Sequence, residues 1–150
     1  MRAVVQRVSR AEVKVNGTST GAISKGLMLL LGIEAGDTLA DSKWLAEKIV
    51  RMRIFPDAED KMNLDLLAVG GELLVVSQFT LHAATKKGNR PSFIRAARPE
   101  EAIPLYEAFL NETEQLLGKS AARGVFGAMM EVELVNDGPV TILIDSRSEL

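Results

Sequence analysis

One stretch near the middle of the chain begins as a buried strand and ends in polar residues. It starts with Leu73-Leu74-Val75-Val76, a short apolar and β-branched run that follows the turn signal Gly70-Gly71. It continues as Ser77-Gln78-Phe79-Thr80-Leu81, which is polar where a buried strand ought to remain apolar. Ligands of α/β proteins bind at the ends of such strands. We therefore expect a functional site at this polar end.

A second unusual stretch, Asn136-Asp137-Gly138-Pro139-Val140-Thr141, lies near the end of the chain. Gly138 supplies backbone freedom, and proline is the residue type for which a cis peptide bond has a small cost. Because Pro139 has no N–H group, a turn at this position presents backbone carbonyls to its surroundings. An ordinary trans turn before the last strand is the alternative. We interpret the two stretches as halves of one pocket.

The remaining sequence alternates between strand and helix patterns. The strand patterns predict strands over residues 3–8, 11–15, 20–23, 27–33, 73–81, 123–135 and 140–144. A hairpin signal, Asn16-Gly17, follows the second of these strands. The run at 27–33 is apolar without alternation, which is typical of a strand covered on both faces.

Two helices are predicted. The first begins near Thr38, where Thr38-Leu39-Ala40-Asp41 resembles a capping box, and it ends at Phe55-Pro56-Asp57. The second runs from Pro99 to Leu117, with Gly118 as its cap. Polar loops are expected at 57–63 and 82–98, an amphipathic piece follows the first loop to Val69, and 146–150 is expected to be a frayed tail. This order predicts one mixed α/β domain over residues 1–150, with helices packed on a sheet.

Composition excludes several kinds of site. The 150 residues include no cysteine and one histidine, His82, so disulfides, thiolate chemistry and multi-histidine metal sites are excluded. No metal or cofactor is expected. The longest apolar run, 27–33, is too short to span a bilayer, and the chain does not begin with a signal-peptide pattern. We expect a cytoplasmic protein with no membrane partner.

Positive charge is concentrated in the segment that follows the central stretch. The chain has a net charge of −2, but the segment from His82 to Arg98 contains no acidic residue. Its basic residues are Lys86, Lys87, Arg90, Arg95 and Arg98. Such local density favours contact with phosphates. A solvated loop is the alternative.

Several motifs together resemble the D-aminoacyl-tRNA deacylase family. They are the two stretches described above, Val5-Gln6-Arg7-Val8, Arg53-Ile54-Phe55 with Lys61-Met62-Asn63-Leu64, and Gly88-Asn89-Arg90-Pro91-Ser92-Phe93. Their order and spacing match the family, and the resemblance covers essentially the whole chain. One departure is His82-Ala83-Ala84-Thr85, which lacks the acidic residue expected before the threonine.

The resemblance implies a homodimer that hydrolyses the ester between a D-amino acid and the 3′-terminal ribose of tRNA. It implies a mostly antiparallel, barrel-like β core with two helices packed on it. The active sites would be shared at the dimer interface, with the terminal adenosine in the pocket. There, a cis Gly138–Pro139 turn from one subunit would reject L-aminoacyl-tRNA, as part of translation quality control. Whether mischarged glycyl-tRNA is also a substrate is left open.

Ser77, Gln78, Phe79 and Thr80 are the candidate residues for the reaction. Phe79 offers a backbone N–H as an oxyanion donor, and the Gln78 amide can hold a loop or the adenosine. Thr80 is either a nucleophile or a positioning group, and a hydroxyl nucleophile needs a base within reach. On an extended strand His82 shares a face with Thr80, but it lies outside the family motif and is interpreted as a rim residue. Positioning is therefore favoured for Thr80.

The other candidate residues bind or select the substrate. Arg7 is expected to brace the Gly138–Pro139 turn through its carbonyls, with a surface strand residue as the alternative. Met129 is expected to line the amino-acid pocket, although a core methionine is the commoner meaning. Lys86, Lys87 and Arg90 are expected to contact tRNA.

Two other classes of function are alternatives to this reading of the sequence. The first is a non-catalytic module that binds RNA or a small molecule at the polar strand end. The second is a serine or threonine esterase, which is disfavoured because the chain has no G-x-S-x-G motif.

Overall fold

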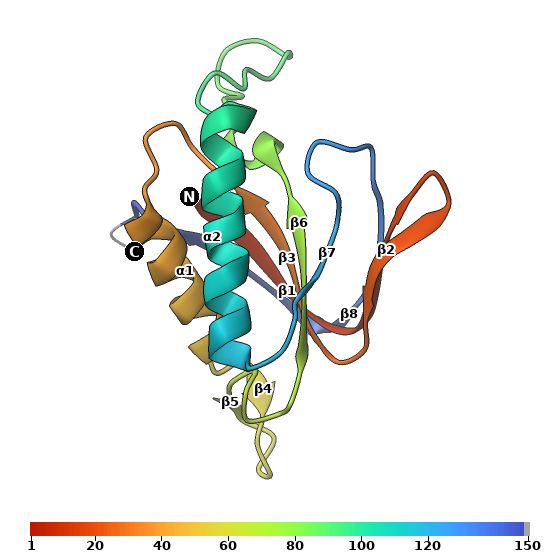
Figure 1. Cartoon of the computed structure of the whole chain (residues 1–150). Coiled ribbons are helices and arrows are strands. Elements are labelled where there is room, and N and C mark those ends of the chain that lie inside the picture. The colour runs from red at the N-terminus through yellow and green to blue at the C-terminus, as the bar shows by residue number, and fades with distance from the viewer. Residues whose placement is uncertain (149–150) are drawn as a thin grey trace.

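The longest run of pairing in the fold joins the strand at the start of the chain to the last strand. The computed structural model describes residues 1–148. β1 (Arg2–Val15) is antiparallel to β8 (Glu131–Asp145) along nearly its whole length. The other edge of β1 pairs first with β3 (Gly26–Gly32) and then with β2 (Thr18–Ile23), both antiparallel. β1 is therefore the strand around which the six-stranded sheet is built (Figure 1).

The sheet curves until its edges approach each other. β6 (Glu72–Ser77) is parallel to β3, and β7 (Ala122–Arg123) is parallel to β6. β7 then lies against β2, where the Thr20 hydroxyl donates to the Arg123 carbonyl oxygen at 3.3 Å. The result is a nearly closed, barrel-like sheet, as predicted from the family resemblance.

Two helices cover one face of this sheet and pack on each other (Figure 1). α1 (Leu39–Arg51) has the capping box predicted for Thr38 and Asp41, and it ends at Arg51, a few residues before the predicted stop. α2 (Pro99–Leu117) has the predicted bounds. Its cap, Gly118, has φ 69°, a left-handed conformation in which a glycine has no steric penalty. No helix among residues 1–148 is long and apolar enough to cross a membrane.

β3 and β6 contribute to two separate hydrophobic cores. Leu29 and Val75 point toward the helices, where they pack with α1 and α2. Met28 and Leu74 point to the other face, where they pack inside the curved sheet. Because both faces are covered, nearly every residue of β3 is buried, and the prediction from its apolar run is confirmed.

Four strands were predicted where the structure has two long ones. Residues 3–8 and 11–15 form the single strand β1, which is bent by a change of register near Ser9. The predicted strand 123–135 is interrupted, because β7 ends at Arg123 and β8 begins at Glu131. β8 then continues through 136–139, the predicted connection, as far as Asp145. Pairing with β1 on both sides of this stretch keeps β8 in the sheet, although residues 137–140 have no paired residue on β1.

The loop prediction for 57–63 was wrong in part. β4 (Phe55–Pro56) and β5 (Met62–Leu64) form a short antiparallel hairpin around this loop.

The prediction of a frayed tail over 146–150 was also wrong for the first residues of that segment. The Ser146 hydroxyl accepts a hydrogen bond from the α-ammonium of Met1 at 3.0 Å, and Arg147 pairs with the buried Asp37 at 2.9 Å. Residues 149–150 lie outside the described residues.

The pairing of β3 with β6 depends on a glycine at the start of β3. A Cβ built on Gly26 would lie 1.9 Å from the carbonyl oxygen of Glu72, which is backbone of the neighbouring strand and has no room to move. We expect Gly26→Ala to lower the free energy of unfolding by about 3 kcal/mol, the upper end of the usual cost of overpacking. Urea unfolding at fixed protein concentration measures it.

Gly17→Ala is the matched control for this substitution. Gly17 has φ 78° but no atom within 4 Å of the added Cβ, so only the left-handed backbone costs free energy, about 1–2 kcal/mol. If both variants lost the same free energy of unfolding, the role assigned to the contact between β3 and β6 at Gly26 would be contradicted.

Candidate active site

The polar end of the central stretch forms a tight turn rather than a continuation of the strand. The ladder between β3 and β6 ends at the pair Leu31 and Ser77, after which the Gln78 N–H donates to the Leu31 carbonyl oxygen at 2.8 Å. The chain then forms a 3₁₀ turn, η1 (Phe79–His82). η1 sits directly against Gly32, where an added Cβ would be 2.9 Å from the Gln78 carbonyl oxygen. The predicted strand 73–81 therefore ends at Ser77.

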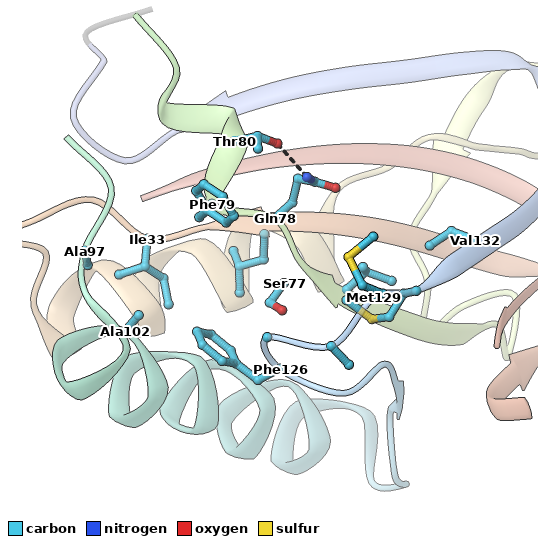
Figure 2. Close-up of a pocket in the computed structure, with 15 residues that line it drawn as sticks. Ile33, Ser77, Gln78, Phe79, Thr80, Ala97, Ala102, Phe126, Met129 and Val132 are labelled. Atoms are coloured by element: carbon cyan, nitrogen blue, oxygen red, sulfur yellow. Dashed lines mark hydrogen bonds between the residues drawn. The ribbon is translucent and has the colours of Figure 1, made fainter. Parts of the chain in front are cut away.

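This turn lies at the edge of a cavity of about 440 Å³ (Figure 2). Its walls come from the ends of β3 and β6, the start of α2 and the segment between β7 and β8. The lining side chains are mostly apolar, and they include all four residues that were predicted to serve the reaction: Ser77, Gln78, Phe79 and Thr80. The cavity is thus an apolar chamber with its polar groups gathered at η1.

Hydrogen bonding within the turn determines how Thr80 can act. The Gln78 amide nitrogen donates to the Thr80 hydroxyl oxygen (Figure 2). The hydroxyl proton of Thr80 is therefore free to be donated elsewhere. No interaction within residues 1–148 joins Thr80 to a basic side chain. This arrangement suits a group that binds substrate better than it suits a nucleophile.

Main-chain donors are also free at this position. The first N–H groups of any helical turn have no partner inside the turn. In η1 these belong to Phe79 and Thr80, and neither has a hydrogen-bond acceptor within the described part of the chain. The Phe79 side chain is 55% exposed, and its ring packs edge-on against Phe93, with 5.2 Å between the ring centroids. Two neighbouring main-chain donors without a partner in residues 1–148 thus belong to the turn that lines the cavity.

His82 is not a rim residue as predicted. It closes η1 with only 1% of its surface exposed, so its side chain lies beneath the turn and not at the cavity mouth. The prediction assumed an extended strand, on which His82 would share a face with Thr80. The 3₁₀ turn removes that relation. From the other side, Arg2 supports the turn by donating to the Leu81 carbonyl oxygen at 3.0 Å.

The second predicted stretch forms a bulge in β8. Four residues, 137–140, lie between the pairs that Asn136 and Thr141 make with β1, where β1 has only Arg7. The Gly138–Pro139 peptide bond in this bulge is cis. None of residues 136–141 lines the cavity. The two stretches therefore do not form one pocket within a single chain.

Side chains on both sides hold this bulge. Arg7 donates through Nε to the Asp137 carbonyl oxygen at 3.0 Å and through Nη1 to the Ile54 carbonyl oxygen at 2.7 Å. Asn136 accepts from the Val140 N–H at 2.9 Å. These bonds fix the main chain on either side of Gly138 and Pro139, and the contact expected between Arg7 and this stretch is made at Asp137.

Part of the cavity wall was missed by the strand prediction for 123–135. Phe126, Ala128 and Met130 belong to the segment between β7 and β8 and line the cavity together with the predicted Met129. Met129 is 91% exposed, so it is not a core methionine. The sequence signal for this wall is a glycine, Gly127, in the middle of an apolar run. In the structure Gly127 has φ 76°, a turn conformation.

The predicted tRNA-binding residues lie in the segment that follows η1. Lys86, Lys87 and Arg90 are exposed, and no ion pair within residues 1–148 uses them. Ala84 and Ser92 pair with each other, which makes this part of the segment a projecting loop (Figure 1). Arg95 is different, because it is paired with the buried Glu34. Among the described residues, no cluster of three or more acidic or histidine side chains can hold a metal ion.

Comparisons with known proteins find relatives over nearly the whole chain. The family described as D-Tyr-tRNA(Tyr) deacylase matches residues 4–145. The chain is 60% identical to a D-aminoacyl-tRNA deacylase of Akkermansia muciniphila over 98% of both chains. It is similar to a structure titled c-Myc DNA Unwinding Element Binding Protein, with a TM-score of 0.92, 40% identity and coverage of 99% and 100%. A probable eukaryotic D-amino acid tRNA deacylase shares the fold, with a TM-score of 0.80, 16% identity and coverage of 95% and 97%.

The bonds of Arg7 make a testable contribution to stability. Its side chain is 11% exposed and donates two charge-assisted hydrogen bonds, one to the exposed carbonyl of Asp137 and one to the part-buried carbonyl of Ile54. We expect Arg7→Met to lower the free energy of unfolding by about 2–4 kcal/mol, measured by urea unfolding at fixed protein concentration.

Arg10→Met is the matched control on the same strand. Within residues 1–148 Arg10 pairs only with Glu133, and both side chains are more than half exposed, so the loss of unfolding free energy should be below about 1 kcal/mol. If both variants lost the same stability, Arg7 would not be holding the bulge.

Proposed function

Because this chain belongs to the D-Tyr-tRNA(Tyr) deacylase family, we propose that it hydrolyses the ester between a D-amino acid and the 3′-terminal ribose of tRNA. The products are the free D-amino acid and tRNA. The protein is then an ester hydrolase, a D-aminoacyl-tRNA deacylase. The observation that carries the proposal is η1, which places free N–H groups and a threonine hydroxyl at the edge of an apolar cavity.

The groups of η1 suit the chemistry of ester hydrolysis. Water attacks the ester carbonyl carbon, the carbonyl oxygen becomes an oxyanion, and the 3′-oxygen of the ribose leaves with a proton that the water has lost. The N–H groups of Phe79 and Thr80 are placed to stabilise the oxyanion, and loss of one such donor typically costs about 10²–10³ in rate. Thr80 positions the substrate. The water is oriented by main-chain groups and by the neighbouring 2′-hydroxyl of the ribose.

The site is completed by a second copy of the chain. Within one chain the Gly138–Pro139 bulge is held firmly but does not reach the cavity edge at η1. The outer edge of β8 has no strand partner within residues 1–148, and Val135 and Leu143 are exposed apolar side chains on the same strand. A homodimer would cover these groups and bring the bulge of each subunit to the active site of its partner.

Main-chain carbonyls of the bulge then select the substrate by its chirality. Gly138 and Pro139 offer almost no side-chain chemistry, so exclusion of an L side chain is steric and comes from the backbone. Such a filter acts on the side chain that an L-amino acid carries. Glycine has none, which is why glycyl-tRNA is a candidate second substrate. Removal of D-aminoacyl-tRNA would serve quality control in translation, in the cytoplasm.

The tRNA occupies both the cavity and the loop after η1. The apolar walls receive the terminal adenosine, with Gln78 as a hydrogen-bonding group beside it. The loop a few residues beyond Thr80 contains the basic residues Lys86, Lys87 and Arg90. The segment from His82 to Arg98 has no acidic residue to neutralise them, so they are placed to contact acceptor-stem phosphates. Phosphate contacts position a nucleic acid without reading its sequence, and many tRNAs should therefore bind alike.

Hydrolysis of D-Tyr-tRNA and L-Tyr-tRNA by the wild type and by Thr80→Ala tests the activity and the selection together. We expect the wild type to hydrolyse the D-ester and leave the L-ester intact. Thr80→Ala should be slower but still measurable, with its D/L preference largely kept, because the filter is in the backbone. Rapid-quench sampling should find no acyl-enzyme in either protein.

Other outcomes point to different assignments. Binding of D-Tyr-tRNA without turnover would make the protein a non-catalytic binding module. A burst of product with an ester on Thr80 would make Thr80 the nucleophile. Substantial hydrolysis of L-Tyr-tRNA by Thr80→Ala would mean that η1, and not the bulge, selects the substrate by its chirality.

The salt dependence of tRNA binding tests whether the loop after η1 contacts the phosphates of tRNA. Changing both Lys86 and Lys87 to Gln should weaken tRNA binding and flatten the slope of log affinity against log salt by about 0.7–0.9 per lost contact. The rate at saturating substrate should hardly change, because these contacts are equal in the ground and transition states. Lys43 and Lys61, which are exposed on α1 and in the β4–β5 hairpin, form the control pair. An unchanged slope would move the docking surface to Arg2, Arg10 and Lys14.

A further inference from the structure

His82 is the one histidine of the chain, and it lies under the turn that carries Phe79 and Thr80. Its ring packs at the end of β3, where a Cβ added to Gly32 would be 3.1 Å from the ring carbon Cδ2 and 2.9 Å from the carbonyl oxygen of Gln78. The imidazole therefore fills the space between the end of β3 and η1. The ring and the turn are thus packed against the same strand end.

The ring is buried with the main chain of Gly32 near it, but no hydrogen bond of good geometry reaches either nitrogen from residues 1–148. Neither Nδ1 nor Nε2 has a hydrogen-bond partner within the described part of the chain. The carboxylate of Glu34 is close, with Oε2 3.9 Å from Nδ1, but this distance is too long for a hydrogen bond. Buried polar groups in native proteins are nearly always paired, and an exception next to an active site calls for a functional explanation.

The charged groups around the ring are already paired with one another. Glu34 already accepts a hydrogen bond from Arg95 Nε at 2.7 Å and pairs with Arg147 at 3.4 Å. Arg2, which is paired with Asp145, faces the same end of η1 through its bond to Leu81. The remaining charges at this end are the α-ammonium of Met1 and Asp37, which pair with each other at 2.8 Å. The nearby carboxylates are therefore all engaged, and a proton on His82 would add an uncompensated charge in a buried place.

We propose that His82 is a positioning residue for η1: its neutral ring holds Phe79 and Thr80 in place, and protonation of the ring releases the turn. The inference rests on the proposed function, since η1 carries the groups assigned there to the ester. His82 touches no reacting atom and acts through the main chain of the turn.

Protonation states at neutral pH are consistent with this role. Burial lowers the pKa of His82, while the main chain of Gly32 and the charge of Glu34 act in the opposite direction. Burial alone would raise the pKa of Glu34, but the hydrogen bond and charge of Arg95 bring it below its usual value. Near pH 7, His82 is therefore neutral and Glu34 is charged.

Packing of η1 weakens at low pH. When η1 is released, His82 returns to water and to an ordinary pKa of about 6.5. The released form thus binds a proton more tightly than the packed form. Packing of the turn weakens as the pH falls below about 6.5, and above that pH both forms are neutral and the balance is constant.

NMR of the full-length protein tests the coupling directly, because one histidine gives one imidazole signal. We expect its titration midpoint to lie below 6.5, and we expect the amide signals of Phe79 and Thr80 to shift with the same midpoint. The amide of Gly70, at the other end of β6, is the internal control and should not follow. Phe79 and Thr80 signals that ignore the His82 titration would overturn the proposal, whether or not the protein is active.

Kinetics of His82→Phe provide the second arm. Phenylalanine keeps the ring but cannot take a proton, so the ratio of kcat for D-Tyr-tRNA between the wild type and this variant should fall with decreasing pH. Below the imidazole midpoint the fall should approach tenfold per pH unit, the slope of a one-proton titration. The ratio cancels pH effects that both proteins share. A ratio that does not change with pH would overturn the proposal.

The two arms separate this inference from the proposed function. If the protein hydrolysed no D-Tyr-tRNA at any pH, the proposed function would fail while the NMR titration still judged the role of His82. If His82→Phe did not fold, the wild-type titration alone would decide.

Discussion

The parallel pairing of β3 with β6 determines where the candidate site forms. The ladder stops at Leu31 and Ser77, and the next residue of β3 is a glycine, so the chain after Ser77 can fold down onto the strand end. A side chain at Gly32 would prevent this contact. The free N–H groups, the Thr80 hydroxyl and the edge of the cavity all follow from the turn that forms there. The same close approach of η1 to Gly32 places His82 under the turn. The ring that packs beneath η1 and the polar groups on η1 therefore both depend on the end of β3.

The Gly138–Pro139 bulge, the proposed second half of the site, depends on a different constraint, the long pairing of β1 with β8. Where β8 supplies four residues opposite Arg7, the extra residues leave the ladder and are fixed by Arg7 and Asn136. The two halves are thus anchored to different parts of the sheet and held rigidly apart within one chain. In the proposed homodimer, a bulge that is already held in place would lose little conformational freedom on docking against the partner subunit.

Local patterns in the sequence predicted the elements whose causes are local. The apolar run of β3, the capping box at Thr38 and the cap at Gly118 each depend on a few neighbouring residues, and all three are confirmed. The end of β6 was mispredicted because it is set by Gly32, which lies on another strand and has no signal near Ser77. The cavity wall at 124–130 was missed although Gly127 marked it, because the surrounding apolar residues resemble a strand. The pairing of the two motifs in one pocket is not realised within one chain.

The bulge opposite Arg7 also bears on how such a protein can change over generations. A carbonyl group is common to every amino acid, so no single codon change removes it, whereas a specificity built from side chains can be lost in one step. If discrimination resides in the main chain of the bulge, what natural selection must preserve is the shape of the fold at that point. Drift in the surrounding sequence would then leave the discrimination intact for as long as Arg7 and Asn136 keep the backbone in place.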